Sequence, residues 1–564
     1  MIGHRAPISG IATYRDEYVA TAGYDNQVIL FDQRGRRALT RVSHDHLANQ
    51  CAFSPDGRVL VTASSDYTAR LWSVPDLRLL AVLADHEDDV EMAAFHPDRA
   101  LVATASRDHR IRLYDLTGRL THRFAGHTAD VISVVWSHDG TELISSSDDG
   151  TVKRWSLKTG ALVEDMDLGG VETDTVAIGA DGTIYAGNDE GEILVITDGN
   201  RKALPAHAAG VKRLVLGAEQ GLLVSLSYDR TLRLWHVAGG TLTPAGGADL
   251  PPDVWPRSCA FAADSTLVFG TFGALYRTYD YAADRWLDEE VPPTQGLNAV
   301  CGTPDGVWAA GDAGVVWRVA EGRRTEQAVL GSLANFLTPS PSGPVLAGGQ
   351  LGQIFDARTG RVLHRHRSPL NCAAVFHTAT GWHAVVGAYT GEGIVLRLDG
   401  TPERVVDVQL HANAIKGVAV SGGMIFSVCA DGGVAWHDAE TYQLIRRVPA
   451  AHDKIVNGCA ALSAGRFASV SRDRTLRLWS ADFHVATLHT PHEHSIKCVA
   501  ASPDGVHVAT GAYDGRIAVY DTITETWADT HRPTTSGISS LAYDAGRGIF
   551  LASAYDGQVY EVPR

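Results

Sequence analysis

Several common signals are absent from this chain of 564 residues. No apolar run approaches the roughly 18–20 residues that a membrane helix needs. The first ten residues lack the apolar core of a secretory signal peptide. We therefore expect no membrane partner and a cytoplasmic location.

Basic charge is scarce. Lys and Arg number 49 against 65 Asp and Glu, which gives a formal net charge of −16. Binding to nucleic acid in general or to anionic membranes needs basic surface, so neither is predicted. Only seven of the basic residues are Lys. This Arg-rich composition is typical of a GC-rich genome and indicates a bacterial source.

Motifs for metal, cofactor or catalysis are also missing. The seven Cys form no CxxC pair, so they indicate neither a zinc site nor a disulfide framework, and we interpret them as small buried side chains. Three His-x-His pairs lack a third and fourth ligand nearby in sequence. No GxSxG, GxGxxG, Walker or HExxH motif occurs. The sequence therefore predicts no metal, no cofactor and no enzyme activity.

A short unit recurs along the chain. Its best copies are SSDYTARLW, SDDGTVKRW, SYDRTLRLW and SRDRTLRLW, in which an aromatic residue follows the Asp by six positions. Well-preserved neighbouring copies are 41 or 42 residues apart. Degenerate copies occur near Glu190, Gly273, Asp312, Gln350 and Thr390. The clear copies carry their Asp at Asp25, Asp66, Asp108, Asp149, Asp229, Asp431, Asp473, Asp514 and Asp556.

A second signature precedes most copies. It is a His followed, four positions later, by an aliphatic or small residue, as at His127 and His452. Between the two signatures lie turn sequences such as Ser-Pro-Asp-Gly, flanked by short stretches rich in Val, Ile, Thr and Ala. Each period therefore predicts several short strands and no helix.

These two signatures at fixed offsets resemble the WD40 family of β-propellers, whose period and four strands per blade match. The resemblance covers the chain from Gly3 to about Val562. It implies about fourteen blades, too many for one ring of four to eight. We therefore predict an all-β protein of two tandem seven-bladed propellers, residues 1–290 and 291–564. The last unit ends at Val562, so its blade is expected to hold three strands and an open edge.

In this family the His, Ser or Thr, Asp and Trp of the repeat form a hydrogen-bonded tetrad inside each blade. A Ser-His-Asp set also invites a hydrolase interpretation. However, the same constellation recurs, and its Ser residues fall on interior strands, so we predict a structural role. The matching sets are His44, Ser64, Asp66 and Trp72; His127, Ser147, Asp149 and Trp155; His207, Ser227, Asp229 and Trp235; and His452, Ser471, Asp473 and Trp479.

The resemblance also places partner binding on the face that carries the Asp turns. There the residue just before the Asp is expected to point outward, and Tyr and Arg dominate interaction hot spots. The alternative, that Tyr merely tolerates this turn, stays open. Tyr24, Tyr228 and Phe272 should form one aromatic patch, with Asp148 and Asp189 on an acidic flank. The candidate partner-binding residues are Tyr24, Arg107, Tyr228, Phe272, Tyr389, Arg472, Tyr513 and Tyr555.

We therefore predict a non-enzymatic scaffold that binds protein partners through its propeller faces, such as a subunit of a bacterial signalling or defence complex. Two alternatives stay open. One is an enzyme with its active site at a central channel, and the other is a double propeller of the actin-interacting type. The bacterial composition argues against an actin role.

Overall fold

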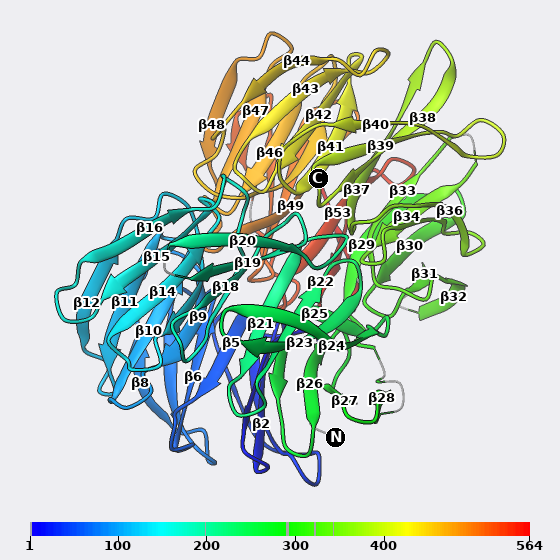
Figure 1. The fold of residues 1–564 in the computed structure, drawn as a ribbon. Helices are drawn as coiled ribbons and strands as arrows, with labels where there is room; N and C mark the ends of the chain where they lie inside the picture. The colour runs from blue at the N-terminus through cyan, green and yellow to red at the C-terminus, as the bar shows by residue number, and fades with distance from the viewer. Residues whose placement is uncertain are drawn as a thin grey trace. The chain divides into compact units, whose positions relative to one another are not determined.

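The computed structural model describes residues 3–197, 199–288, 291, 293–320, 323–341, 343–528 and 530–564. Strands and turns make up this described part of the chain (Figure 1). It contains no helix with the length and apolar character needed to cross a membrane. Contacts divide the chain into two compact units, unit 1 at Met1–Thr294 and unit 2 at Gln295–Arg564.

Unit 1 consists of seven antiparallel sheets, each formed by four strands consecutive in sequence. Its strands are β1 (Ile8–Tyr14), β2 (Tyr18–Gly23), β3 (Gln27–Asp32), β4 (Arg37–Ser43), β5 (Ala48–Phe53), β6 (Val59–Ser64), β7 (Ala69–Ser73), β8 (Leu79–Leu83), β9 (Val90–Phe95), β10 (Leu101–Ser106), β11 (Arg110–Asp115), β12 (Leu120–Ala125), β13 (Val131–Trp136), β14 (Glu142–Ser147), β15 (Thr151–Ser156), β16 (Leu162–Asp167), β17 (Thr175–Ile178), β18 (Ile184–Gly187), β19 (Glu192–Thr197), β20 (Asn200–Pro205), β21 (Val211–Gly217), β22 (Leu222–Ser227), β23 (Thr231–Ala238), β24 (Thr241–Asp249), β25 (Val254–Phe261), β26 (Thr266–Thr271), β27 (Arg277–Asp280) and β28 (Arg285–Trp286).

Unit 2 repeats this plan, with six four-stranded sheets and a final sheet of three strands among its described residues. Its strands are β29 (Leu297–Thr303), β30 (Gly306–Gly311), β31 (Val315–Ala320), β32 (Arg323–Val329), β33 (Ala334–Pro339), β34 (Val345–Gly349), β35 (Gln353–Asp356), β36 (Arg361–Arg365), β37 (Leu370–Thr378), β38 (Gly381–Ala388), β39 (Glu392–Arg397), β40 (Glu403–Gln409), β41 (Ile415–Ser421), β42 (Met424–Cys429), β43 (Val434–Asp438), β44 (Leu444–Val448), β45 (Val456–Ala461), β46 (Phe467–Ser471), β47 (Thr475–Trp479), β48 (Val485–His489), β49 (Ile496–Ala501), β50 (His507–Ala512), β51 (Ile517–Asp521), β52 (Thr526–Trp527), β53 (Ile538–Asp544), β54 (Ile549–Ala554) and β55 (Val559–Val562).

The core lies between neighbouring sheets. The second strand of a sheet is almost fully buried, as in β6 and β22, because sheets pack on both of its faces. Each hydrophobic cluster therefore combines side chains from two adjacent blades. Full burial of one Val, Leu or Phe side chain contributes roughly 1.5–3 kcal/mol. Repeated packing of this kind stabilises blades that could not fold singly.

Each unit closes on itself. In unit 1, Phe31 of the first sheet packs with Val268 and Tyr276 of the seventh. In unit 2, Val300 packs with Leu551 of the three-stranded sheet. Both units are thus seven-bladed rings, which confirms the predicted fold class.

Details of the repeat also match the expectation. All five degenerate copies lie in the turn between the second and third strands of a blade, for example Asp312 between β30 and β31. The final blade has three strands among the described residues, as predicted. The unit boundary lies four residues beyond the predicted one, after Thr294 rather than after residue 290.

A β-bulge recurs near the start of the innermost strand of most blades. In β5 the register steps from Ala48 to Gln50, so that Asn49 is the extra residue. A bulge re-aims a side chain out of the regular ladder. In unit 2 the bulge residues line the cavity surrounded by the seven innermost strands. They are Asn298, Asn335, Asn371, Lys416, Asn457, Lys497 and Ser539.

Candidate functional site

A network through a His links the turn Asp to the interior of six blades among the described residues. In the β5–β8 blade, His44 Nδ1 lies 2.9 Å from Asp66 Oδ2 and His44 Nε2 lies 2.7 Å from Thr62 Oγ1. The Trp72 indole N–H donates to the same hydroxyl at 2.8 Å. Asp66 also accepts from the backbone N–H of Thr68. Burial opposes ionisation of Asp66, but the bond and charge of His44 outweigh it and lower the pKa of the carboxyl.

The predicted hydroxyl of each set is corrected by the structure. His44 and Trp72 meet Thr62 and not Ser64, and the other three sets use Ser145, Ser225 and Ser469. Side chains two positions apart share one face of a strand, so the sequence offset alone did not decide between them. The serines that the sequence predicted for the network lie at the end of the same strand. There, each hydroxyl accepts a hydrogen bond from the backbone N–H of its turn Asp. They are Ser64, Ser147, Ser227 and Ser471.

These hydroxyls do not face solvent. Thr62, Ser145 and their counterparts are fully buried. Their oxygen is also shared between a ring nitrogen and an indole N–H. The sets therefore cross-link strands and turns within a blade.

On the turn face of unit 1, the side formed by its Asp-bearing turns, the predicted aromatic patch is only partly present. Phe272 was predicted to be exposed, but it is buried at 3% exposure. It packs on Trp255, with ring centroids 5.5 Å apart, and this contact covers its ring. Tyr24 is half-buried against the same indole, at 5.1 Å. Tyr228 lies beneath the Lys212 ammonium, 5.1 Å from its ring centroid.

Charges on this face are paired. Arg107 forms ion pairs with Glu91 and Asp130. Lys212 binds Asp174 and Asp189, so Asp189 belongs to an ion-pair network. Asp148 lies near the carboxylates of Glu172, Asp130 and Asp174, and burial together with these charges raises the pKa of its carboxyl, so this part of the predicted flank is acidic. Arg107 and Lys212 are thus neutralised by neighbouring carboxylates.

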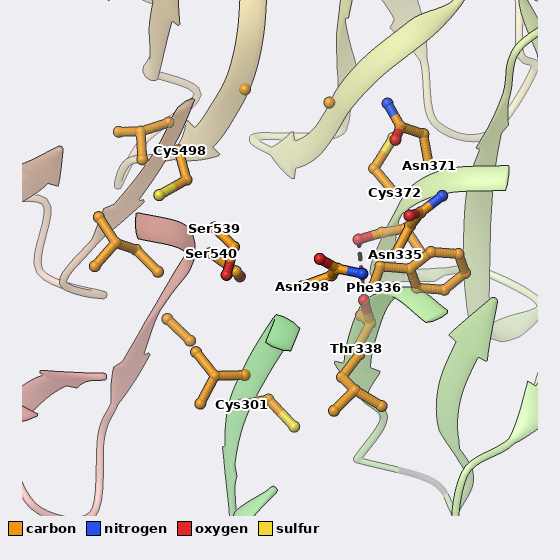
Figure 2. Close-up of a pocket in the computed structure, with 18 of the residues that line it drawn as sticks. Asn298, Cys301, Asn335, Phe336, Thr338, Asn371, Cys372, Cys498, Ser539 and Ser540 are labelled. Atoms are coloured by element: carbon orange, nitrogen blue, oxygen red, sulfur yellow. Dashed lines mark hydrogen bonds between the residues drawn. The ribbon is translucent and has the colours of Figure 1, made fainter. Parts of the chain in front are cut away.

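Unit 2 has a cavity of about 390 Å³ surrounded by its innermost strands (Figure 2), and of the predicted residues Tyr555 lines it. Its wall consists of the innermost strands, with Asn298, Ser539 and Ser540 facing the open space. Asn371 donates across to the backbone carbonyl of Ile415, the first residue of the next innermost strand, at 3.0 Å. Asn335 and Asn457 make the equivalent bonds to Leu370 and Ile496. These amides tie neighbouring blades together around the cavity.

Cations and tyrosines gather at this cavity. The Lys416 ammonium lies 4.4 Å from the ring centroid of Tyr389. Tyr513 and Tyr555 stack at 6.5 Å, and Tyr555 contributes to the cavity wall. The charge interaction with Tyr513 raises the pKa of Lys497. Tyr389, Arg472, Tyr513 and Tyr555 are all partly exposed.

The sequence reasoning missed the two lysines, although a signal exists. Lys416 and Lys497 each follow the repeat His by five positions, as does Asn457. This offset is the bulge position, so in each clear repeat it names the residue re-aimed by the bulge. The family tetrad includes the His but not the residue at this offset.

Comparison with known proteins agrees with this geometry. The family model of the WD domain, G-beta repeat, matches residues 37–73, 77–115, 118–156, 443–480 and 484–521. The first three matches lie in unit 1 and the last two in unit 2. Each match spans an outermost strand and the first three strands of the next blade.

Similar proteins include apoptotic protease-activating factor 1 of Rattus norvegicus, 23% identical over 40% of this chain and 19% of its own length. The transcriptional corepressor LEUNIG_HOMOLOG of Arabidopsis thaliana is 22% identical over 40% of this chain and 34% of its own length. The guanine nucleotide-binding protein subunit beta of Zea mays is 25% identical over 39% of this chain and 67% of its own length. The alignments thus span about a fifth and a third of the first two relatives. Together with the blade geometry, these matches show WD40 repeats at five positions of the chain, in both of its units.

Proposed function

We propose that this chain is a non-enzymatic recognition protein that binds acidic segments of partner proteins on the turn face of unit 2. WD40 repeats and WD-repeat relatives support a protein-interaction scaffold in general. The observation that carries the specific proposal is the group of Lys416, Lys497 and partly exposed tyrosines at the central cavity.

The chemistry of this group favours a carboxylate-bearing partner. Lys416 and Lys497 present ammonium groups beside aromatic rings, in a wall that also contains the amides of Asn298, Asn335 and Asn371. Complementary charge steers association and selects the partner. Tyrosines such as Tyr513 and Tyr555 supply large contact area with few rotatable bonds.

The proposal extends to the cellular setting. We place the protein in a reducing compartment such as the cytoplasm, because all seven cysteines are free thiols. The Arg-rich composition supports a bacterial host, in which such a protein would serve as a docking subunit of a signalling or defence assembly. The relatives' names describe a factor that activates a protease, a corepressor of transcription and a subunit of a guanine nucleotide-binding protein.

The test is affinity purification from the native host with the wild type and the double variant Tyr513→Ala, Tyr555→Ala. We expect the variant to lose specific partners while its melting temperature stays within about 1–2 °C, as is usual for surface changes. Leu444→Ala with Ile445→Ala is the matched control, because both side chains are exposed on the outer strand β44, at 51% and 45%. An unchanged partner set in the tyrosine variant would contradict the proposal.

A further inference from the structure

The β41–β44 blade differs from the other well-preserved blades at two positions of its network. Cys429 stands where the neighbouring blade has Ser471, and His437 stands where that blade has Trp479. Both replacements exchange a structural side chain for one that binds metal ions. Both side chains are buried, and neither lines the central cavity at which the protein-binding group lies.

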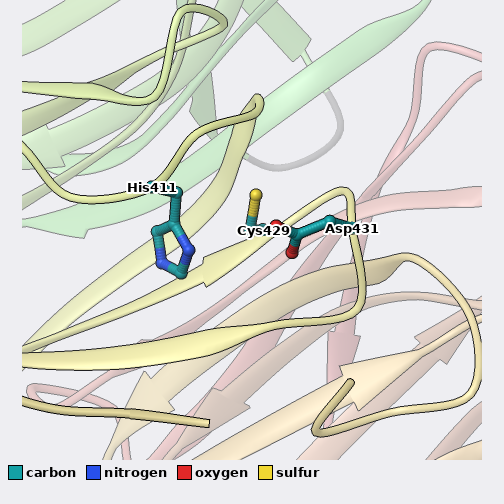
Figure 3. A group of neighbouring side chains, drawn as sticks. All are labelled: His411, Cys429 and Asp431. Carbon is teal, nitrogen blue, oxygen red and sulfur yellow. The ribbon is translucent and has the colours of Figure 1, made fainter. Parts of the chain in front are cut away.

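The side chains of this blade are brought together at the turn. His411 Nε2 lies 2.9 Å from Ser427 Oγ, so its other ring nitrogen is turned toward Cys429 and Asp431 (Figure 3). The Cys429 thiol lies beside the Asp431 carboxylate. One ligand atom from each of His411, Cys429 and Asp431 lies within 4.8 Å of the other two.

We propose that His411, Cys429 and Asp431 form a binding site for a zinc ion. Imidazole nitrogen, thiolate sulfur and carboxylate oxygen are the three ligand types that Zn²⁺ takes from proteins. Bonds of 2.0–2.3 Å in a tetrahedron place ligand atoms about 3.3–3.8 Å apart. The three ligand atoms, all within 4.8 Å of one another, are about 1 Å from that spacing.

The surroundings suit such an ion. Ser427 holds the imidazole from behind, as the hydrogen-bonded partner of a metal-ligating His commonly does. Asp431 is exposed, whereas His411 and Cys429 are buried, so an ion can enter from the solvent side. A water molecule supplies the fourth ligand from the same side.

Other blades of the same chain provide an internal contrast. In the adjacent blade His452 Nδ1 lies 2.9 Å from Asp473 Oδ2, and His127 lies 2.8 Å from Asp149. There the imidazole and carboxylate satisfy each other directly, and a serine occupies the position of Cys429. The site is therefore specific to the β41–β44 blade.

Binding involves no change of oxidation state. The Cys429 S–H bond breaks, its proton passes to solvent, and the thiolate electron pair forms the Zn–S bond. Asp431 and His411 coordinate the ion through lone pairs, and neither releases a proton when the ion binds. Affinity should therefore rise with pH.

The test uses the full chain, stripped with a chelator and titrated with Zn²⁺, and with Co²⁺ as a spectroscopic probe. We expect one tightly bound ion per chain and a thiolate-to-cobalt charge-transfer band in the near ultraviolet. Cys429→Ser should abolish the band and weaken Zn²⁺ binding by at least the roughly 10–100-fold that loss of an outer-shell partner costs. This variant should fold, since serine stands at the equivalent position in other blades.

Cys459→Ser is the matched control, because Cys459 lies in the adjacent blade outside the group. It should leave both the band and the affinity unchanged. Two results would overturn the proposal. One is a wild-type chain that binds no Zn²⁺ at stoichiometric concentration, and the other is a Cys429→Ser variant that binds it as the wild type does.

Discussion

Removal of the turn carboxylate should destabilise a blade without affecting any surface property. We consider Asp149→Ala in unit 1 and Asp473→Ala in unit 2. The Asp149 carboxylate accepts from His127 Nδ1 at 2.8 Å, from the backbone N–H of Thr128 and of Thr151 at 3.0 Å, and from the Thr151 hydroxyl at 2.6 Å. Asp473 makes the equivalent four bonds.

The magnitude follows from which donors lose every partner. The N–H of Thr128 lies at an exposed position and regains water, so its loss costs little. The His127 imidazole has a side-chain exposure of 1%, so water does not replace the carboxylate, and its Nδ1 keeps only the longer 3.3 Å contact with the Thr151 hydroxyl. A buried donor left unsatisfied costs about 1–3 kcal/mol, and a charge-assisted bond adds to this. We expect each variant to lose about 3 kcal/mol, or roughly 5–10 °C in melting temperature.

The assay is thermal unfolding of the full chain, followed by circular dichroism at matched concentration. Glu219→Ala is the control, since Glu219 is an exposed carboxylate in a turn of unit 1, and its loss should shift stability by less than about 0.5 kcal/mol. If both Asp variants melt where the wild type does, the carboxylate does not hold the turn and our account of the network fails.

Two further predictions concern acid and fragmentation. Burial lowers the pKa of His492 from 6.5 to about 4; the charge of Asp514 opposes this shift, and that of Arg516 adds to it. The unfolded chain therefore takes up the proton first as the pH falls. Stability should decrease by roughly 3 kcal/mol between pH 6.5 and pH 4. His492→Gln should flatten that part of the pH profile of the unfolding free energy, and a profile identical to the wild type would refute the assignment. A fragment of residues 1–294 should fold alone, because its seven blades close without residues from unit 2. Limited proteolysis and expression of the fragment test this, and failure to obtain a folded product of that size would count against two independent rings.

The sequence predicted the fold well because the repeat constrains backbone and side chains together. The Asp, the His and the aromatic residue recur at fixed offsets, and each offset corresponds to one turn or strand of a blade. Even degenerate copies such as Asp312 and Gln350 kept the spacing, since a missing blade would open the ring. The spacing between repeats is thus kept in copies that have lost the characteristic residues.

Individual contacts were harder to predict. Ser64 and Thr62 share a strand face, so only the rotation of His44 decides which hydroxyl joins the network. Phe272 was placed outward by its position in the repeat, but Trp255 from another strand covers it. Both errors concern side-chain contacts between different segments, which the spacing of the repeat does not determine.

The bulge position shows how one scaffold can present different chemistry in two rings. Its backbone geometry is set by the ladder on either side, so the side chain itself is free to vary without loss of the blade. In unit 1 Glu91 and Lys212 occupy this position, and both are tied into ion pairs. In unit 2 Lys416 lies over a tyrosine ring, while Asn371 and Asn457 bridge to the next blade. In unit 1 an acidic partner would meet the carboxylates of Asp174 and Asp189 that flank Lys212, so we expect acidic partners to select unit 2 and to bind unit 1 only weakly. Lys416→Glu should therefore weaken partner capture by unit 2, whereas Lys212→Glu should mainly reduce the stability of unit 1. Pull-down, measured together with thermal unfolding, distinguishes the two outcomes. Equal loss of capture in both variants would show that the rings share one binding specificity and that this argument from the bulge position is wrong.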